Sequence, residues 1–492
     1  MDELKKYRLP LISFLDRYTI DLSILLCIFL GFLVSMFFFI TSPLFTLAIL
    51  VGGFIFVISI FKPEVGILIL VIILSSIVFE SFLPLIPVPF GSFHLTDVML
   101  LSLLIMIPFK LFLDRSLRLV PTPLDPPLYL FYAAAIISVF RAIMSFGVDF
   151  NNVTRIFRPI TYYLVFFVIT NLLREKRQIK FMINGLFVVA NIVGLAIIIQ
   201  AIVGRSIQLL PGRLQAAGVF ATRIIPPGTT LIYIAFITAV CTIVFINRPI
   251  LKSIHFYMLP LIGTGILLTY WRSYWAAIIF SLSILMVLVS KRSKKRYIAY
   301  LLIAVILMSI FSFTLLSIGG KPKEQLISIF DRFTSLFTGN KIYHSDTLNW
   351  RRIENKFALR QIVKHPLLGI GLGNDFRAIL YRGELAVNYS SWWLHNAYLW
   401  ILMKMGLIGF LPFLWFYIRF LIRGFSNWKK IKDVTLKSAV TGFMLSGVGL
   451  ILIVNIEPLF MMWDSIVVIA IIIGLTETII KINKEELTSQ NG

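Results

Sequence analysis

Residues 181–203 read FMINGLFVVANIVGLAIIIQAIV and contain no charged side chain. A helix of about 20 apolar residues spans the roughly 30 Å hydrocarbon core of a bilayer. Similar runs recur along the whole chain of 492 residues, of which 59% are hydrophobic and 14% are charged. Soluble domains average about 25% charged residues. This composition excludes a soluble enzyme, a disordered protein and a disulfide scaffold, and it predicts one polytopic membrane domain.

The lengths of the apolar runs predict an all-α integral membrane protein with about 12–14 transmembrane helices and one long extracytoplasmic loop. The candidate spans are residues 20–40, 44–61, 65–87, 95–113, 127–146, 157–173, 181–203, 227–246, 253–270, 273–290, 297–318, 395–421, 436–456 and 459–480. They divide the chain into an N-terminal tail (1–19), a first group of helices (20–318), the loop (319–394), a C-terminal group of helices (395–481) and a tail (482–492). The runs on either side of Arg272 are either two spans or one broken element, and such a break needs protein or water around it.

The basic residues set the orientation. The net charge is +23, and Lys and Arg collect in cytoplasmic loops. With a cytoplasmic N-terminus, the inside loops hold the basic clusters at 110–118, 174–180, 248–252, 291–296 and 429–432. The opposite orientation would place all of these clusters outside. We therefore predict an even number of spans with both termini in the cytoplasm.

The outward loops before residue 319 carry arginine but no lysine in this topology. The residues are Arg141, Arg155, Arg158, Arg205, Arg213, Arg223 and Arg272. A topology rule does not choose between Lys and Arg, whereas a phosphate ligand does, because the planar guanidinium binds phosphate oxygens in pairs. The alternative is that these arginines only reach the membrane interface and pair with lipid phosphates.

Chemically active side chains are few. Of five histidines, His395 lies where the long loop meets a span, on the face with the arginines, and a neutral imidazole there can accept a proton. The sequence contains no metal-binding motif, and Cys27 and Cys241 both lie in apolar runs. We therefore expect neither a metal nor a cofactor. The acids Glu80, Glu457 and Asp464 are interpreted as partners of the outward arginines, with a proton relay as the alternative.

The long loop contains the main departure from the apolar pattern. Residues 324–337 place apolar side chains at helical spacing, which predicts an amphipathic helix at the membrane surface. Residues 349–358 predict a second helix. Pro366 and the alternating glycines of 365-HPLLGIGLGN-374 predict a tight turn after it. Trp392 and Trp393 fit the interface where the chain re-enters the membrane.

The stretch 394-LHNAYL-399, followed by 406-GLIG-409, resembles the signature of the O-antigen ligase and polymerase superfamily. The turn 365–374 resembles the Pro-Leu-x-Gly-x-Gly-x-Gly-Asn segment of that family, and Arg352 resembles the arginine that opens its loop helix. The resemblance covers about residues 150–475.

Weaker similarities follow in the same order along the chain. Residues 272-RSYWA-276 are similar to the family's Ser-Arg-x-x-Trp segment, 211–220 to its Arg…Gly-x-Phe segment, and Arg158-Pro159 to a further pattern. The acid of the family's Leu-x-x-Glu-x-Gly stretch is replaced here by Lys404 or Met405. The predicted number of spans also exceeds the dozen usual for the ligases.

The resemblance implies a metal-independent, inverting glycosyltransferase that acts outside the membrane. Such an enzyme moves a glycan from undecaprenyl diphosphate to a hydroxyl of a glycan, lipid or protein acceptor. In this sequence, Arg213 and Arg272 would stabilise the leaving diphosphate, and His395 would act as general base. Arg223, Arg352 and Arg158 are expected to contact phosphate or sugar.

Three other functions stay open from the sequence. A polymerase that joins lipid-linked repeats of an O-antigen, capsule or teichuronic-acid-like polymer uses the same parts and differs in its acceptor. A protein O-oligosaccharyltransferase and a transporter or flippase of lipid-linked glycan are the others. Membrane lipids are the remaining partners, and nucleic acid is not expected. We expect the protein in the bacterial plasma (inner) membrane, with its active site facing the periplasm or the cell exterior.

Overall fold

The computed structural model describes residues 43–75, 77–79, 85–88, 91–114, 117–205, 207–216, 222–245, 254–291, 294–295, 297–299, 302, 320–334, 346–376 and 393–491. The predicted span 20–40 and nearly all of 297–318 lie outside these residues, as do Cys27, Glu80 and Trp392.

Helices dominate the described residues. Those of the N-terminal half are α3 (Pro43–Phe61), α4 (Pro63–Leu74), α5 (Leu95–Leu113), α6 (Asp125–Phe146), α7 (Phe150–Thr161), α8 (Val165–Leu172) and α9 (Lys176–Val203). The later ones are α10 (Thr229–Phe245), α11 (Ile254–Leu268), α12 (Arg272–Leu288), α14 (Gly320–Thr334), α16 (Asp346–Lys364), α17 (Ala397–Asn427), α18 (Val434–Ile453) and α19 (Trp463–Asn491).

Seven helices among the described residues are long and apolar enough to cross a membrane, and shorter apolar helices accompany them. The predicted all-α polytopic fold is confirmed. The candidate span at Trp463–Ser489 is the most buried of the seven. Its mostly apolar side chains, from Ile466 to Ile480, are covered on nearly all sides by the other helices. This helix therefore lies at the centre of the bundle.

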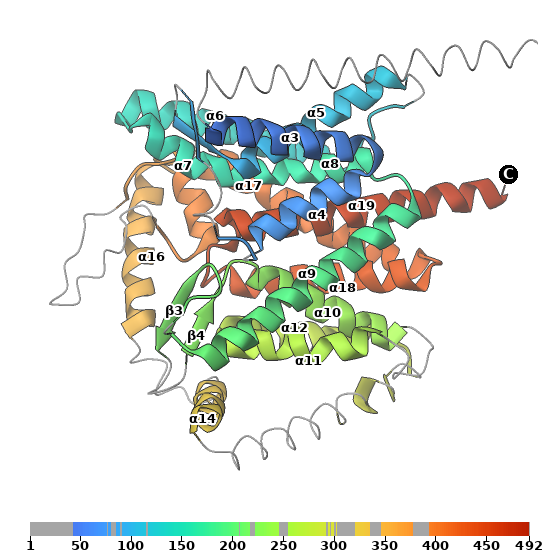
Figure 1. Ribbon diagram of the computed structural model, residues 1–492. Helices are drawn as coiled ribbons and strands as arrows, with labels where there is room; N and C mark the ends of the chain where they lie inside the picture. The colour runs from blue at the N-terminus through green and yellow to red at the C-terminus, as the bar shows by residue number, and fades with distance from the viewer. Residues whose placement is uncertain are drawn as a thin grey trace, which may run out of the picture.

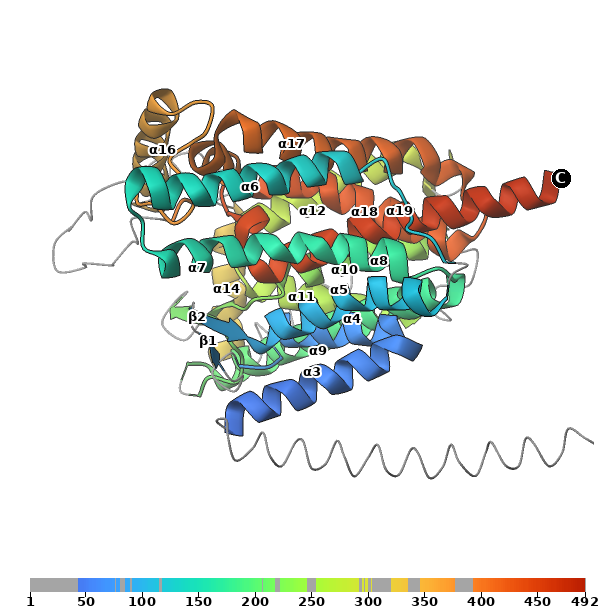
Figure 2. The same ribbon diagram turned by 90° about the horizontal axis from the view of Figure 1, so that it is seen from above.

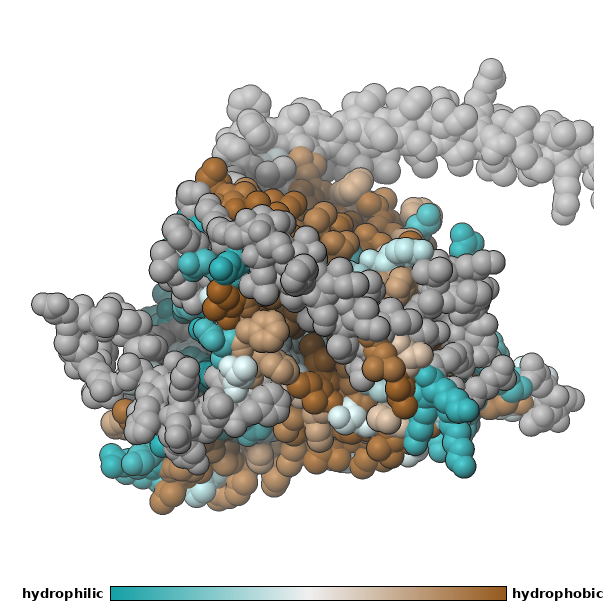
Figure 3. Space-filling model, turned by 90° about the horizontal axis from the view of Figure 1, so that it is seen from below, coloured by the Kyte–Doolittle hydropathy of each residue, from teal (hydrophilic) through white to brown (hydrophobic). Residues whose placement is uncertain are grey.

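The long helices run side by side, and the shorter polar elements gather at one end of the bundle (Figures 1 and 2). Helix α16 crosses that end, where α14 and two β-hairpins also lie, and the C-terminal end of α19 points the other way. The surface is apolar along the helices, with hydrophilic side chains towards the two ends (Figure 3). This pattern suits a bundle whose middle faces lipid. We call the end with α16 the hairpin end.

The two β-hairpins were not expected from the sequence. Strands β1 (Leu85–Val88) and β2 (Gly91–His94) pair antiparallel, as do β3 (Arg213–Ala216) and β4 (Thr222–Ile225). The predicted span 65–87 is therefore wrong at its end, because α4 stops at Leu74 and residues 85–88 form a strand. Pro87 lies within that strand, and a proline lacks the N–H group that a helix interior requires.

Helix α17 is broken about a third of the way along by Gly406, whose backbone has φ 63°. A break inside a membrane helix leaves carbonyl and N–H groups without helical partners, and other protein groups must satisfy them. The glycine turn predicted at 365–374 supplies those groups. The N–H of Ile370 donates to the carbonyl of Met403 at 2.8 Å, and that of Gly371 donates to the carbonyl of Lys404 at 3.0 Å.

Backbone hydrogen bonds between the glycine turn and α17 run in both directions. The N–H of Leu407 donates to the carbonyl of Pro366 at 2.9 Å. The turn comes so close that a Cβ on Gly369 would lie 2.5 Å from the backbone of Lys404, and one on Gly371 would lie 2.7 Å from Ala142 of α6. Both glycines have positive φ, which other residues rarely adopt. The turn thus ties the end of α16 to the broken part of α17 and fixes the two helices relative to each other.

Candidate functional site

His395 and Glu354 form a hydrogen-bonded pair at the hairpin end. The imidazole Nδ1 lies 2.7 Å from Oε2 of Glu354, whose side chain is 1% exposed. The Nε1–H of Trp350 donates to the other carboxylate oxygen at 2.8 Å. An ionised carboxylate only accepts hydrogen bonds, so Nδ1 carries the proton and Nε2 of the neutral ring keeps its lone pair. The carboxylate therefore sets the tautomer that a general base needs.

The local sequence explains how the pair is positioned. His395 directly precedes Asn396, which caps α17 by accepting the N–H of Leu399 at 3.0 Å. Glu354 lies on the buried side of α16, one turn before Ala358, which is also buried. The turn that ties α16 to α17 thus fixes Glu354 on α16 relative to His395, which lies just before the cap of α17.

A second ion pair adjoins the first. Arg351 lies three residues before Glu354, so the two share a face of α16. Its Nη2 donates to Oε1 of Glu457 at 2.9 Å. Glu457 lies in the connection between α18 and α19. Burial raises the pKa of the Glu457 carboxyl, although Arg351, His395 and Arg223 oppose that rise. Glu457 thus pairs with Arg351, which was not one of the seven arginines expected as its partners, and of those seven Arg223 interacts with it through its charge.

Arginines converge on the turn between α11 and α12. The predicted meeting point at Arg272 is the start of α12, and residues 269–271 separate it from α11. Arg223 of β4 donates from Nε to the carbonyl of Thr269 at 3.2 Å. Arg332 of α14 donates to the carbonyl of Tyr270 at 3.4 Å, and its guanidinium lies 5.8 Å from the centre of that tyrosine ring. Tyr270 has φ 55°, so the turn is a strained one.

These guanidinium groups are close enough to repel one another. Burial, together with the positive charges of Arg332, Arg351 and Arg272, lowers the pKa of Arg223 to about 10, while Glu457 opposes that fall. Burial and Arg272 likewise lower the pKa of Arg332. Buried like charges disfavour the charged form of each group, and a bound anion would relieve that cost. We call Arg223, Arg272, Arg332 and Arg351 the arginine cluster.

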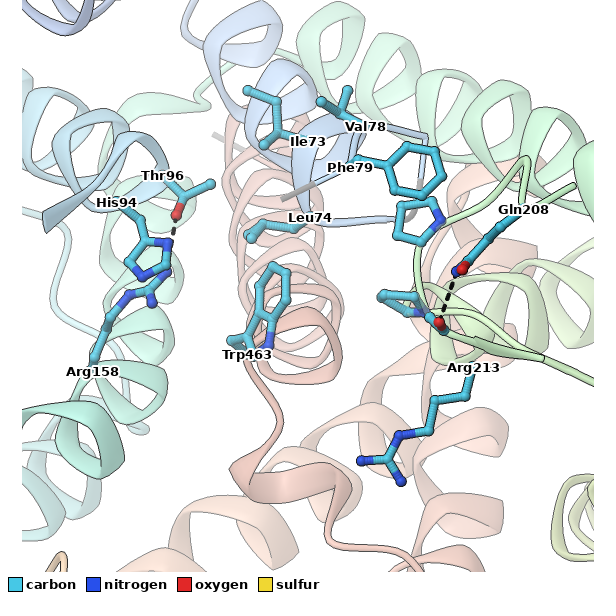
Figure 4. A pocket seen from close by; sticks show the side chains of 13 residues that line it. Ile73, Leu74, Val78, Phe79, His94, Thr96, Arg158, Gln208, Arg213 and Trp463 are labelled. Atoms are coloured by element: carbon cyan, nitrogen blue, oxygen red, sulfur yellow. Dashed lines mark hydrogen bonds between the residues drawn. The ribbon is translucent and has the colours of Figure 1, made fainter. Parts of the chain in front are cut away.

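Arg213 and Arg158 lie in a different place, on the walls of a cavity of about 530 Å³. Figure 4 shows Arg158, His94 and Thr96 on one side, with Gln208 and Arg213 on the other. The side chains of Leu74 and Trp463 lie between the two sides. Arg158 donates from Nε to Asp97 at 2.9 Å, and Arg213 is exposed.

The register of the second hairpin relates the cavity to the arginine cluster. Arg213 pairs with Ile225, and Gln215 pairs with Arg223. Side chains of such pairs share one face of a hairpin, which makes Arg213 and Arg223 diagonal neighbours, about 7–8 Å apart at the backbone. Arg223 donates to Gln215 on this face at 3.2 Å. The cavity therefore adjoins the arginine cluster.

The structure thus brings together His395, Arg272 and Arg223 of the predicted residues, and places Arg213 and Arg158 beside them around the cavity. Arg352 is exposed on α16, and the adjacent Arg351 reaches Glu457 instead. Sequence reasoning did not single out Glu354, Arg351 or Arg332. The spacing of Trp350, Arg351 and Glu354 on one helix was the available signal for the first two. Among the described residues, no group of three or more His, Cys, Asp and Glu side chains is suited to a metal.

A comparison with known protein families gives one match. Residues 256–414 match the family model described as O-antigen ligase. The matched region runs from α11 to the broken part of α17, and it includes Arg272, Arg332, Arg351, Glu354 and His395. No curated protein matches the chain. The match over residues 256–414 supports an O-antigen ligase-like family for this polytopic membrane protein, and with it a membrane enzyme of the ligase or polymerase type.

Proposed function

We propose that the protein transfers a glycan from undecaprenyl diphosphate to an acceptor hydroxyl, without a metal and with inversion at the anomeric carbon. The observation that carries the proposal is the 2.7 Å contact between His395 and Glu354 beside the arginine cluster. A base, its orienting carboxylate and groups that bind an anion are the parts that this reaction needs.

His395 acts as the general base in this mechanism. The acceptor oxygen attacks the anomeric carbon and forms the new glycosidic bond while the bond from that carbon to the diphosphate oxygen breaks. Nε2 of His395 takes the hydroxyl proton, and Glu354 stabilises the imidazolium through Nδ1–H. Both bonding electrons of the broken bond leave with the diphosphate. A positioned base contributes about 10²–10⁴-fold to such a rate.

The arginine cluster binds the leaving group. The cluster holds four guanidinium groups, of which Arg351 pairs with Glu457 and Arg223 interacts with the same carboxylate through its charge. Arg272 and Arg223 contact the diphosphate in this proposal, and Arg332 joins them from α14. Arg213 reaches the diphosphate from the adjoining cavity. Fixed cations of this kind stabilise charge that develops in the transition state. Arg352 and Arg158 stay proposed contacts to sugar or phosphate.

The proposed orientation places the hairpin end outside the cytoplasm. The basic residues Lys429 and Lys430 follow α17 at the end opposite to α16, and the C-terminus lies at that end too (Figures 1 and 2). Positive residues favour the cytoplasmic side. We propose a bacterial plasma membrane location, with both termini inside and with the glycine turn, α14 and α16 in the extracytoplasmic loop 319–394.

Reconstitution tests the proposal. Purified protein in liposomes is given a glycan linked to polyprenyl diphosphate, together with glycan, lipid or protein acceptors. A single addition product indicates a ligase, and a ladder of products indicates a polymerase. Transport of the lipid without a new glycosidic bond would instead identify a flippase. His395→Ala should lower transfer by about 10²–10⁴-fold. The matched control is His255→Ala in α11, which removes an imidazole that packs against Phe187. Near-normal transfer by the His395 variant would reject the base.

A further inference from the structure

We propose that Tyr270 is a positioning residue, which holds Arg332 of α14 beside Arg272 so that both guanidinium groups meet the diphosphate of the donor. Tyr270 does not itself contact the substrate and acts through the arginine. This inference rests on the proposed function, because the donor diphosphate is the ligand in that reaction. It adds a residue of the turn between α11 and α12 to the groups that prepare the site.

The backbone of Tyr270 is held in an unfavourable conformation. Its φ is 55°, and in the part of the chain that the structure describes it is the one residue other than glycine with a positive φ. Glycine adopts this conformation readily, whereas a residue with a Cβ is strained there. The side chain is also fully buried. Because strain of this kind clusters at functional sites, a tyrosine at this position points to a role for its ring.

Tyr270 contacts the guanidinium of Arg332 in two ways. Its carbonyl accepts a hydrogen bond from Nη1 at 3.4 Å, and the centre of its ring lies 5.8 Å from the guanidinium carbon. An aromatic face attracts a cation within about 6 Å of the ring centre. Phe333, the next residue of α14, lies against Trp275 of α12 with the ring centres 6.4 Å apart. The arginine end of α14 is therefore fastened both to the turn and to the helix that begins at Arg272.

The preceding carbonyl of the same turn holds a second arginine. Arg223 donates from Nε to the carbonyl of Thr269 at 3.2 Å. Both carbonyls follow the C-terminal end of α11 at Leu268, where a helix carries partial negative charge. A neutral carbonyl fixes the place of a guanidinium, whereas an ionised carboxylate would also cancel its charge. The turn thus places two arginines without itself neutralising them.

Holding contacts are needed because the arginines repel one another. Burial and the charge of Arg272 lower the pKa of Arg332, so the charged form is disfavoured where it lies. Without contacts that oppose this cost, the side chain of Arg332 would turn towards water. Tyr270 keeps the side chain in place before the donor binds. Less of the binding energy is then spent on ordering that side chain.

Binding of a fluorescent polyprenyl diphosphate without a glycan, measured on the full chain in nanodiscs, tests this role. Tyr270→Leu removes the ring and should weaken binding about 5- to 10-fold, as expected for a partly buried contact between a cation and an aromatic face. Tyr270→Phe keeps the ring and should bind nearly as well as the unaltered chain. Equal losses in the two variants, or normal binding by Tyr270→Leu, would reject the role of the ring.

A second replacement keeps the test valid if Tyr270→Leu does not fold. Replacing Tyr270 by trifluorophenylalanine preserves the size of the ring and weakens the negative charge of its face. Binding should then fall relative to Tyr270→Phe while the unfolding midpoint stays the same. A purely structural ring would tolerate the fluorines, so unchanged binding would overturn the inference.

Coupling between Tyr270 and Arg332 distinguishes positioning from general damage. Arg332→Gln should weaken binding by at least the same factor, and Tyr270→Leu should add almost nothing in that background. Lys323→Gln is the matched control, because it removes an exposed positive charge from the same helix. An uncharged polyprenol with the same fluorophore should bind all variants equally. Full additivity in the double variant, an equal loss in Lys323→Gln or a parallel loss of the polyprenol would contradict the proposal.

Transfer kinetics separate this inference from the proposed function. In the glycan-transfer assay, Tyr270→Leu should raise the KM of the donor several-fold and leave the KM of the acceptor unchanged. Normal transfer with an unchanged donor KM in this variant rejects the positioning role alone. Binding of the diphosphate that depends on Tyr270, in a protein that transfers no glycan, rejects the proposed function alone.

Discussion

Replacement of Glu354 by glutamine is the sharpest test of the histidine pair. The change removes a charge and keeps the size of the side chain. With its amide oxygen in the place of Oε2, glutamine still accepts the Nδ1–H of His395 and loses only the hydrogen bond from Nε1–H of Trp350, which donates to Oε1 at 2.8 Å. The side chain is 1% exposed, so water cannot replace the lost charge next to His395. The fold should therefore survive while the environment of the base changes.

The expected magnitude follows from the 2.7 Å contact. A hydrogen bond to a charged partner contributes about 1.5–3 kcal/mol, and one between neutral groups about 0.5–1.5 kcal/mol. The difference of about 1.5 kcal/mol applies when His395 becomes positive in the transition state, which corresponds to roughly a tenfold loss in kcat. Glu354 acts through the histidine, so the KM of the donor should change little.

The assay is the initial rate of labelled glycan transfer in proteoliposomes, with the thermal unfolding midpoint as a measure of folding. Glu486→Gln is the control, because it removes a carboxylate that pairs with Lys176 at a partly exposed site. A double variant with His395→Ala gives the decisive comparison, because coupled residues are not additive. Glu354→Gln should cost almost nothing further in that background. A full tenfold loss there, or a normal rate in the single variant, would refute the positioning role.

Three other predictions concern the surrounding structure. Gly371→Ala should destabilise the protein by more than about 2 kcal/mol, because the residue has φ +88° and the added Cβ would clash with α6. Thermal unfolding measures this loss. Gly53→Ala is the control, because a Cβ there meets no atom within 4 Å. Burial raises the folded-state pKa of the Glu457 carboxyl above the ordinary 4.5, so the folded protein binds the carboxyl proton more tightly than the unfolded chain does. Stability therefore falls as the pH rises from about 4.5 through the folded-state pKa. In Glu457→Gln, the unfolding midpoint should depend less on pH over that range. Arg223→Gln should raise the KM of the donor about 10-fold in the transfer assay, and an unchanged KM would remove Arg223 from the donor site.

The apolar runs predicted most helices because a span of about 20 apolar residues is determined by local composition. The span 65–87 was extended too far, although Pro87 was visible. A prediction from run length and hydropathy treats a proline as one more apolar residue. The proline nevertheless has no backbone N–H to donate to a helical hydrogen bond. The short strands β3 and β4 left no such local signal, since Arg213–Ala216 contains two polar residues among four.

The site was predictable only in part. His395 and the outward arginines follow from residue type and topology. Glu354 lies 41 positions from its histidine, and only the packing of α16 against α17 brings them together. The placement of Arg213 and Arg223 on one face of the second hairpin, where the cavity adjoins the arginine cluster, depends on the register of that hairpin. The register cannot be read from the sequence here. It matters because a shift of one residue would turn these side chains to the opposite face.

The backbone pairing between the glycine turn and the broken helix limits how this protein can be recombined with relatives. The carbonyls of Met403 and Lys404 need the N–H groups of Ile370 and Gly371, and neither partner is complete alone. A chimera that exchanges only the loop would join a foreign turn to a native break, and buried peptide groups would lose their hydrogen bonds. Specificity grafts should therefore move residues 346–427 as one unit, with the loop and the kinked helix from the same parent.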